Sequence, residues 1–354
     1  MKKYYLYVAL LLSSISFAQD KEAADKLVEE GIAYHDKGDY DGAIVRYDKA
    51  LKLDKNNLFA LAEKAYSLLS LTKYEESIQY CKTAIENYPD KAELKSVYVT
   101  YGNALDEMKK TDRALEIYDE GLSKFPDYYQ LYFNKGITYS SIRKYDEAAL
   151  CFQNAIRINP KHASSLNALG RIEKLSNKRI PALLAFSRFF IVEPQTDRAK
   201  QNLEAIQGLL SQGVEKTGKK SVNITIDSRV LPDSTDTSKR QNDFSQVDLL
   251  LSLVSAADFD KKNTRKTDVE NFIRKFETIC SSLEELKKDN SGFYWDVIVP
   301  YFIEMKNKKL IEPFAYIVFS SSNNEDVSKW IKKNDARLDI FYYWSKEYNW
   351  KKNN

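Results

Sequence analysis

The chain has 354 residues, of which 43% are hydrophobic and 30% are charged, and its formal net charge is +3 at pH 7. This length predicts two or three domains, and the near balance of 54 basic and 51 acidic residues argues against nucleic acid as a partner. The three cysteines, Cys81, Cys151 and Cys280, are an odd number, so they do not form the disulfide framework of a small secreted domain.

Residues 1–18 have the three parts of a secretory signal peptide. Lys2 and Lys3 precede an apolar run over residues 4–12, and Ser16-Phe17-Ala18 supplies a small-residue cleavage site. The run is too short for an ordinary membrane span, although an uncleaved anchor helix is the alternative. Cleavage would leave Gln19 first. We therefore expect a protein exported across the inner membrane, periplasmic or associated with the outer membrane, with no membrane span after signal cleavage.

A spacing of about 34 residues recurs between residues 22 and 210. Four units share a glycine, an alanine twelve residues later and an aromatic residue sixteen residues later. These are Gly31, Ala43 and Tyr47; Gly102, Ala114 and Tyr118; Gly136, Ala148 and Phe152; and Gly170, Ala182 and Phe186. A fifth unit keeps the same frame with Ala65, Ser77, Cys81, Ala84 and Pro89. Such a period predicts a stack of helical hairpins, each of which buries a face of the next.

Packing explains the residue types in this frame. Small residues stand where two helix backbones approach closely, and aromatic rings fill the gaps between layers. Pro89, Pro126, Pro160 and Pro194 end units because proline lacks an N–H and clashes with the preceding helical turn. One interval, from Pro89 to Pro126, is 37 residues instead of 34, so three extra residues precede that unit.

The pattern resembles the tetratricopeptide repeat (TPR) family, with units at 24–57, 58–91, 95–128, 129–162 and 163–196. The resemblance implies an all-α solenoid of five helical hairpins over residues 22–210. Residues 197–210 carry Ala199, Leu203, Ile206 and Leu210 at helical spacing, which is typical of a capping helix.

In that family, the first helix of each repeat lines a concave groove that binds a protein or an extended peptide. Carried onto this sequence, the resemblance implies a partner-binding groove that contains Val28, Ile32, His35, Phe59, Tyr66, Asn103, Asp106, Phe133, Ile137, Asn167, Arg171 and Lys174. One TPR subclass binds a terminal carboxylate with Lys and Asn in its first repeat, and Val28 and Ile32 stand at those positions here. The groove grades from apolar through acidic to basic, which favours an extended polypeptide with apolar anchors. The alternative is that another part of the same chain fills the groove.

Residues 211–242 read as a linker, and residues 243–354 as a small helical domain without the repeat frame. All four tryptophans lie in this domain, at helical spacing with other apolar residues. Such aromatic residues favour a packed core. An aromatic-lined groove for a ligand is the alternative.

The chain lacks the common sequence signatures of catalysis. Its two histidines, His35 and His162, belong to no metal-binding pattern, and the G-x-x-x-x-G-K string at residues 213–219 lacks the strand and the hydroxyl residue of a phosphate-binding loop. We therefore expect a non-enzymatic adaptor or scaffold of the bacterial cell envelope, without a cofactor or a metal. The alternatives are a ligand-binding or catalytic C-terminal domain targeted by the repeats, and self-association through the repeats.

Overall fold

The computed structural model describes the backbone of residues 2–218, 221–225 and 240–350, and the side chains of residues 19–218, 221–225 and 242–350. The chain separates into two compact units, unit 1 over residues 1–144 and unit 2 over residues 145–354. The division falls in the turn between α7 and α8, inside the fourth expected repeat, whereas the sequence predicts a linker at residues 211–242. Each unit is described by itself below.

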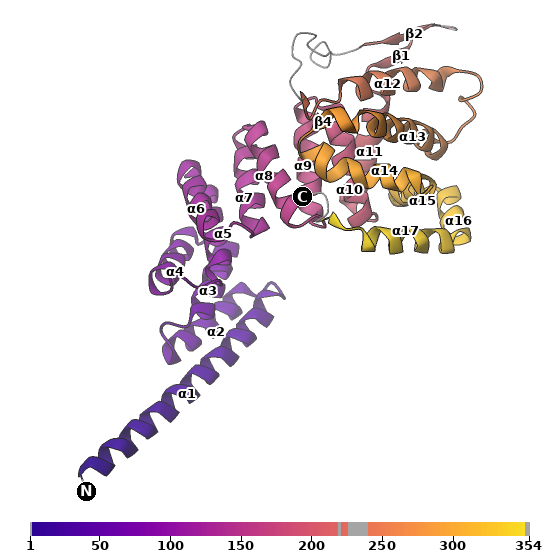
Figure 1. The fold of residues 1–354 in the computed structure, drawn as a ribbon. Coiled ribbons are helices and arrows are strands. Elements are labelled where there is room, and N and C mark those ends of the chain that lie inside the picture. The colour runs from indigo at the N-terminus through magenta and orange to yellow at the C-terminus, as the bar shows by residue number, and fades with distance from the viewer. Residues whose placement is uncertain (1, 219–220, 226–239, 351–354) are drawn as a thin grey trace. The chain divides into compact units, whose positions relative to one another are not determined.

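Unit 1 consists of antiparallel helices that follow one another along the chain (Figure 1). They are α1 (Lys2–His35), α2 (Tyr40–Leu53), α3 (Leu58–Ser70), α4 (Tyr74–Asn87), α5 (Leu94–Glu107), α6 (Thr111–Lys124) and α7 (Tyr129–Ser141). Each helix packs on the next one in sequence, and the first helices of successive repeats also contact one another. This is the solenoid that the 34-residue period predicts. The side chains of residues 1–18, where the signal peptide is expected, lie outside the described ones.

Every turn between the two helices of a repeat holds one residue in the left-handed backbone region. These residues are Gly38, Thr72, Lys109, Arg143 and Asn177, with φ between 58° and 81°. They are 34 residues apart except for the step from Thr72 to Lys109, which is 37, so the three extra residues lie between repeats. A left-handed residue after a helix end lets two backbone N–H groups bond to carbonyls of the last turn. In the third repeat, Lys109 N–H donates to Asp106 at 2.8 Å and Lys110 N–H to Leu105 at 2.9 Å.

Three glycines of the repeat frame, Gly31, Gly102 and Gly170, face aromatic rings of the following helix. A Cβ added to Gly31 would lie 2.3 Å from the ring of Tyr47, and one added to Gly102 would lie 2.3 Å from the ring of Tyr118. In the second repeat, Ala65 takes the glycine position and the smaller Cys81 takes the aromatic position. A smaller side chain at the aromatic position thus leaves room for the methyl group of Ala65 at the glycine position.

Unit 2 begins with α8 (Tyr145–Ile158), α9 (Ala163–Leu175), α10 (Arg179–Val192) and α11 (Asp197–Ser211). The residues of α10 from Arg179 to Phe190 are all buried. A helix that is buried on every side lies inside a protein, and α10 contacts α9, α11, α12 (Ser245–Ala256) and α15 (Ile311–Val318). The expected capping helix, α11, is present, but α12 and the short helix at Phe319–Ser321 cover it.

The C-terminal helices are α12 (Ser245–Ala256), α13 (Asp268–Leu286), α14 (Val299–Asn307), α15 (Ile311–Val318), α16 (Glu325–Lys333) and α17 (Asp335–Glu347). Figure 1 shows α12–α15 beside α10 and α11. A π-helical turn at Tyr294–Ile298 precedes α14, and Pro300 lies in the first turn of α14. Aromatic rings fill this core. Phe276, for example, contacts Phe302 and Phe314 with ring centroids 5.3 Å apart.

Buried charged side chains join α10 to the C-terminal helices. Arg179 pairs with Asp248 at 2.8 Å, and its Nε donates to the carbonyl of Leu209 at 2.6 Å. The guanidinium carbon of Arg188 lies 3.9 Å from the ring centroid of Trp350 and 4.5 Å from that of Tyr301. Burial lowers the pKa of Arg188 to about 10. The last repeat and the C-terminal helices therefore share one core.

The expected linker contains three short strands. β1 (Val214–Lys216) and β2 (Val222–Ile224) pair antiparallel with each other, and β3 (Arg240–Gln241) pairs in parallel with β4 (Asn290–Ser291), which lies outside the linker. The strand β1 follows Gly213, which has φ of 74°, directly after α11. The G-x-x-x-x-G-K string therefore lies on a hairpin, and its last residue, at position 219, is outside the described part.

Candidate peptide-binding face

We define the first-helix face of unit 1 as the side of α1, α3, α5 and α7 that carries the predicted groove residues. Four apolar side chains stand exposed on it: Ile32 is 36% exposed, Phe59 52%, Tyr66 47% and Ile137 42%. Phe133 is half-buried. They lie on α1, α3 and α7, and exposed apolar side chains that gather on one face are the kind of surface that a partner covers.

Val28 does not belong to this exposed set. It is 4% exposed and packs in the core cluster with Ala24, Ala43 and Tyr47. Along α1, residues 24, 28 and 31 lie three or four positions apart and form the buried stripe, whereas Ile32 lies on the outer side. The expectation that Val28 is an accessible anchor is therefore wrong.

His35 connects the first two repeats. Its Nδ1 lies 2.7 Å from Ser67 Oγ, and its ring stacks on Tyr66 with centroids 4.6 Å apart. Burial lowers the pKa of His35, although the neighbouring Asp36 acts to raise it. The imidazole is therefore neutral at pH 7, and its stacking fixes the orientation of the exposed Tyr66 ring.

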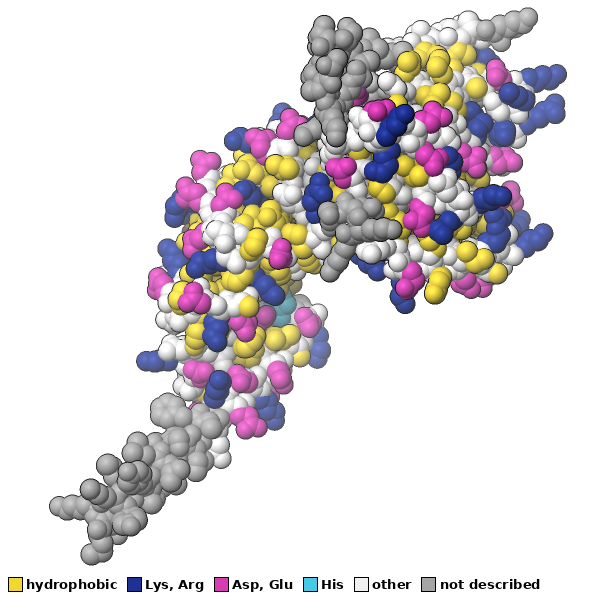
Figure 2. Space-filling model, in the orientation of Figure 1, with side chains coloured by type: hydrophobic (Ala, Val, Ile, Leu, Met, Phe, Trp, Pro, Cys, Tyr) yellow, Lys and Arg dark blue, Asp and Glu magenta, His cyan; other side chains and the backbone are white. Residues whose placement is uncertain are grey.

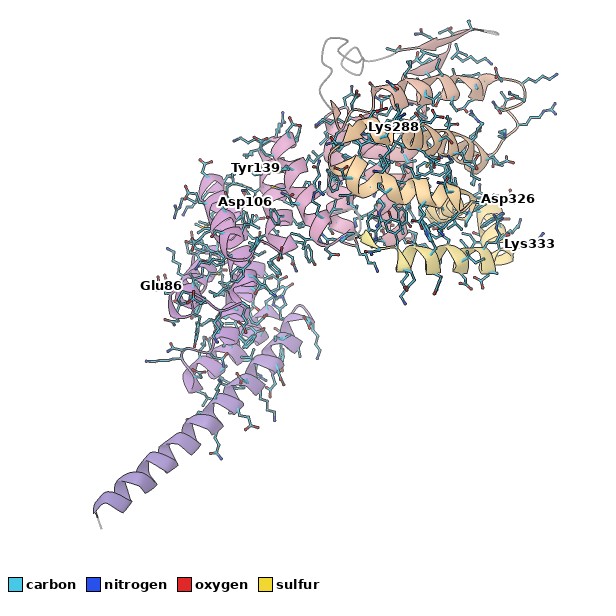
Figure 3. The ribbon with its side chains drawn as sticks, viewed as in Figure 1. Glu86, Asp106, Tyr139, Lys288, Asp326 and Lys333 are labelled. Atoms are coloured by element: carbon cyan, nitrogen blue, oxygen red, sulfur yellow. The ribbon has the colours of Figure 1, made fainter. Side chains whose placement is uncertain are left out.

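A cavity of about 380 Å³ opens on the same face between α3, α5 and α7. Two of the predicted groove residues, Asn103 and Asp106, line it, and Figure 3 labels Asp106 near the end of α5. Asn103 accepts a hydrogen bond from Tyr118 Oη at 2.6 Å, and Asp106 accepts one from Thr138 Oγ1 at 2.9 Å. These bonds hold an amide and a carboxylate at the cavity wall.

Sequence reasoning missed several residues of this cavity. Asn134 and Thr138 of α7 line it, and so do Tyr74 and Tyr118. Tyr118 was expected only as a buried ring between layers, but its hydroxyl reaches Asn103. Asn134 lies at the sixth position of its repeat, one place beyond the groove position of Phe133, and a polar amide on an otherwise apolar helix face is the signal that could have identified it.

The charged groove positions of unit 1 are all acidic. In the TPR family, positions 2, 5, 9, 12 and 13 of each repeat point into the groove. At these positions the charged residues of α1, α3, α5 and α7 are Asp25, Asp36, Asp106 and Glu107, and none is a lysine or arginine. Burial, together with Asp36, also raises the pKa of the half-buried Glu63 beside this face. The remaining visible surface of both units intersperses acidic and basic side chains (Figure 2). The first-helix face thus favours a cationic ligand over an anionic one.

The corresponding face of α9, in unit 2, has the opposite charge. Arg171 and Lys174 are exposed, and Asn167 is half-buried. The C-terminal helices contact α10 and α11 and leave Arg171, Lys174 and Leu175 exposed. Within unit 2, the C-terminal helices therefore do not cover the predicted groove residues of the last repeat.

Two of the three cysteines are unsuited to nucleophilic chemistry. Burial raises the pKa of the thiols of Cys81 and Cys280, which keeps them protonated. In the part of the chain whose side chains are described, no three His, Cys, Asp or Glu residues are grouped so as to hold a metal ion.

Three family models match the chain, and all describe the same repeat. The tetratricopeptide repeat models match residues 129–162 and 60–91, and a TPR repeat model matches residues 31–63. The chain contains tetratricopeptide repeats. The matches at residues 60–91 and 129–162 coincide with the second and fourth predicted units, and the match at residues 31–63 overlaps the first predicted unit, 24–57, and the start of the second. The match at residues 129–162 spans α7 and α8.

The TPR region is similar to parts of longer proteins. The chain is 30% identical over 155 residues to the protein STIP1 homolog of Dictyostelium discoideum, which covers 35% of this chain and 28% of that protein. It is 30% identical over 175 residues to the Hsp70-Hsp90 organizing protein of Triticum aestivum, covering 40% of this chain and 30% of that protein. The chain thus spans less than a third of the length of these relatives.

Among solved structures, a thermophilic TPR protein of Thermus thermophilus is 18% identical, with a TM-score of 0.46 and coverage of 52% of this chain and 99% of that chain. The pilF protein of Pseudomonas aeruginosa is 19% identical, with a TM-score of 0.44 and coverage of 55% and 91%.

Proposed function

We propose that this protein is a non-enzymatic TPR adaptor whose first-helix face in unit 1 binds an extended polypeptide. The observation that carries the proposal is the set of exposed apolar side chains on three of the four first helices of unit 1, Ile32 on α1, Phe59 and Tyr66 on α3, and Ile137 on α7. The TPR matches support a protein ligand, because this repeat serves protein binding in the family that the sequence resembles.

The face offers two kinds of contact. The apolar residues provide anchors for apolar side chains of the ligand, and burial of such side chains contributes about 1.5–3 kcal/mol each. The amides of Asn103 and Asn134 line the cavity and could bond to the ligand's peptide groups. The four carboxylates at groove positions favour Lys or Arg in the ligand.

The proposed ligand is not a chaperone carboxyl terminus bound by the first repeat. The relative in Triticum aestivum is an Hsp70-Hsp90 organizing protein. In this chain, however, Val28 and Ile32 occupy the positions where the carboxylate-binding TPR subclass has Lys and Asn. Val28 is buried, and the charged groove positions of unit 1 are acidic, so a carboxylate would be repelled there.

The decisive experiment selects ligands from a displayed library of random peptides with the purified chain. We expect enrichment of peptides with spaced apolar residues and Lys or Arg, and a tenfold or greater loss of affinity in the variant Phe59→Asp/Tyr66→Asp. The matched control is Val45→Asp/Leu53→Asp, which changes two exposed apolar residues on α2, outside the first-helix face. Equal affinity of both variants for the selected peptides would rule out the proposed face.

We further propose that the protein acts in the envelope of a Gram-negative bacterium, as a component that assembles or stabilises an envelope or secretion complex. The support is the sequence of residues 1–18. Among the residues whose side chains are described, no helix has the length and apolar character needed to cross a membrane. Fractionation of a Gram-negative host followed by N-terminal sequencing should find a periplasmic chain that begins at Gln19. A cytoplasmic chain that retains residues 1–18 would contradict the location without affecting peptide binding.

A further inference from the structure

A second cavity lies far from the TPR frame, in the C-terminal helices of unit 2. Its volume is about 960 Å³, and it lies between α14 and α17, closed on one side by Lys308 and Leu310. This volume is at the upper end of those of ligand pockets in proteins. Neither the TPR matches nor the first-helix face involves this cavity.

Apolar side chains form the floor and one wall of this cavity. On α17, Ile340 is 60% exposed and Tyr343, one turn further along, is 73% exposed. Trp344 is half-buried below them, and its indole N–H donates to Glu304 Oε1 at 2.6 Å. A contiguous exposed apolar surface beside a cavity is typical of a site that binds another molecule.

Carboxylates flank this apolar strip. Asp339 and Glu347 are exposed on the same face of α17, eight residues apart, which places them about 12 Å apart along the helix axis. Glu304 lies on the opposite wall, and the one ammonium group at the cavity, that of Lys308, is already 3.9 Å from Glu304. Among the described residues, neither Asp339 nor Glu347 has a cationic partner.

We propose that this cavity binds a basic amphipathic helix of a partner protein. A groove between two helices accommodates a third helix through apolar residues at every third or fourth position. A helix that laid such residues on Ile340 and Tyr343 would bring a lysine or arginine at each end within reach of Asp339 and Glu347. The charge of the rim is thus complementary to the basic face of that helix. This site is independent of the proposed peptide binding by unit 1.

The test uses the purified full chain and a synthetic 14-residue amphipathic peptide of leucine and lysine. Binding is followed by calorimetry and by the change in tryptophan fluorescence, because Trp344 lines the cavity. We expect Asp339→Lys/Glu347→Lys to weaken binding at least tenfold, and Tyr343→Ala to weaken it several-fold. The matched control is Glu277→Lys/Glu285→Lys, which reverses two exposed carboxylates with the same spacing on α13.

Retained binding by the α13 variant, with loss in the α17 variant, supports the site. Equal loss in both variants would show attraction by overall charge and overturn it, and so would an absence of binding by the unaltered chain. Loss in Phe59→Asp/Tyr66→Asp instead would place the peptide on the first-helix face. A dimer in sedimentation velocity that Asp339→Lys/Glu347→Lys dissociates would show that a second copy occupies the cavity, which would overturn the assignment to a partner protein.

Discussion

The second helices of the repeats occupy the same place in the 34-residue frame but differ in how much of them is buried. In α2, the buried residues are Ala43, Tyr47 and Ala50, whereas α10 is buried from Arg179 to Phe190. The difference follows from their surroundings, because α10 contacts α12 and α15 in addition to its neighbours α9 and α11. The frame thus fixes only the residues between neighbouring helices. The outer face of each repeat is free to meet solvent or to join another core.

The largest change in stability is expected when the buried Arg179 is replaced, and the more exposed Arg46 serves for comparison. Arg179→Ala should lower the free energy of unfolding by about 3–5 kcal/mol, because it removes the partner of Asp248 inside a core. Arg46→Ala removes a more exposed pair with Glu30 on α1 and should cost below about 1 kcal/mol. Urea titrations followed by circular dichroism measure both. Similar losses would mean that α10 is no more buried in solution than α2.

The second test concerns the close approach of helices inside a repeat. Gly102→Ala places a methyl group 2.3 Å from the ring of Tyr118 and should destabilise the protein by about 1–3 kcal/mol. Gly208→Ala, on α11, meets nothing within 4 Å, and should stabilise the protein by up to about 1 kcal/mol because alanine favours a helix. Thermal unfolding should therefore shift in opposite directions for the two variants.

A smaller change in stability is expected from glycine substitutions at one left-handed turn residue in each unit. Thr72 is β-branched and has φ of 59°, a conformation that disfavours such side chains, so Thr72→Gly should raise the free energy of unfolding by about 1 kcal/mol. Lys309, between α14 and α15, has the same φ but no branch at Cβ, and Lys309→Gly should gain less. A loss of stability in Thr72→Gly, measured by urea titration, would show that its side chain contributes contacts that outweigh the backbone strain.

The smallest expected effect depends on pH and on one histidine in each unit. Burial lowers the pKa values of His35 and His162 below the usual value of 6.5. As the pH falls through 6.5, these histidines therefore bind protons more readily in the unfolded chain than in the folded one, and the free energy of unfolding decreases. All four tryptophans lie between residues 295 and 350, and their fluorescence follows unit 2. His162→Gln should therefore reduce the decrease seen by fluorescence between pH 7 and 5, whereas His35→Gln should leave it unchanged.

The sequence predicts the repeat region well because the residues of the 34-residue frame pack against residues close to them in the chain. Gly102 against Tyr118 and Ala65 against Cys81 are contacts within one hairpin, and their spacing is visible in the chain. The all-α fold, the repeats and α11 were predicted for this reason. The signal peptide and the domain boundaries stay predictions.

The sequence predicted the residues of the candidate site less completely. Val28 was assigned to the groove by its position in the repeat, but the actual rotation of α1 places it with Ala24 in the core. The cavity next to Asn103 also depends on Asn134, from the following repeat. Likewise, the sequence of α10 does not reveal that Asp248, 69 residues beyond Arg179, belongs to the covering helix. Contacts of this kind join segments whose separation follows no period.

The covering of α11 has a consequence for assembly. Its apolar residues Ala199, Leu203, Ile206, Leu209 and Leu210 are all buried by neighbours in the same chain. A solenoid whose last helix exposed such residues could add another hairpin, or the first hairpin of another molecule, and grow into a filament. Here the C-terminal helices occupy the apolar surface on which such growth would start. They therefore close this end of the array against the addition of a further hairpin.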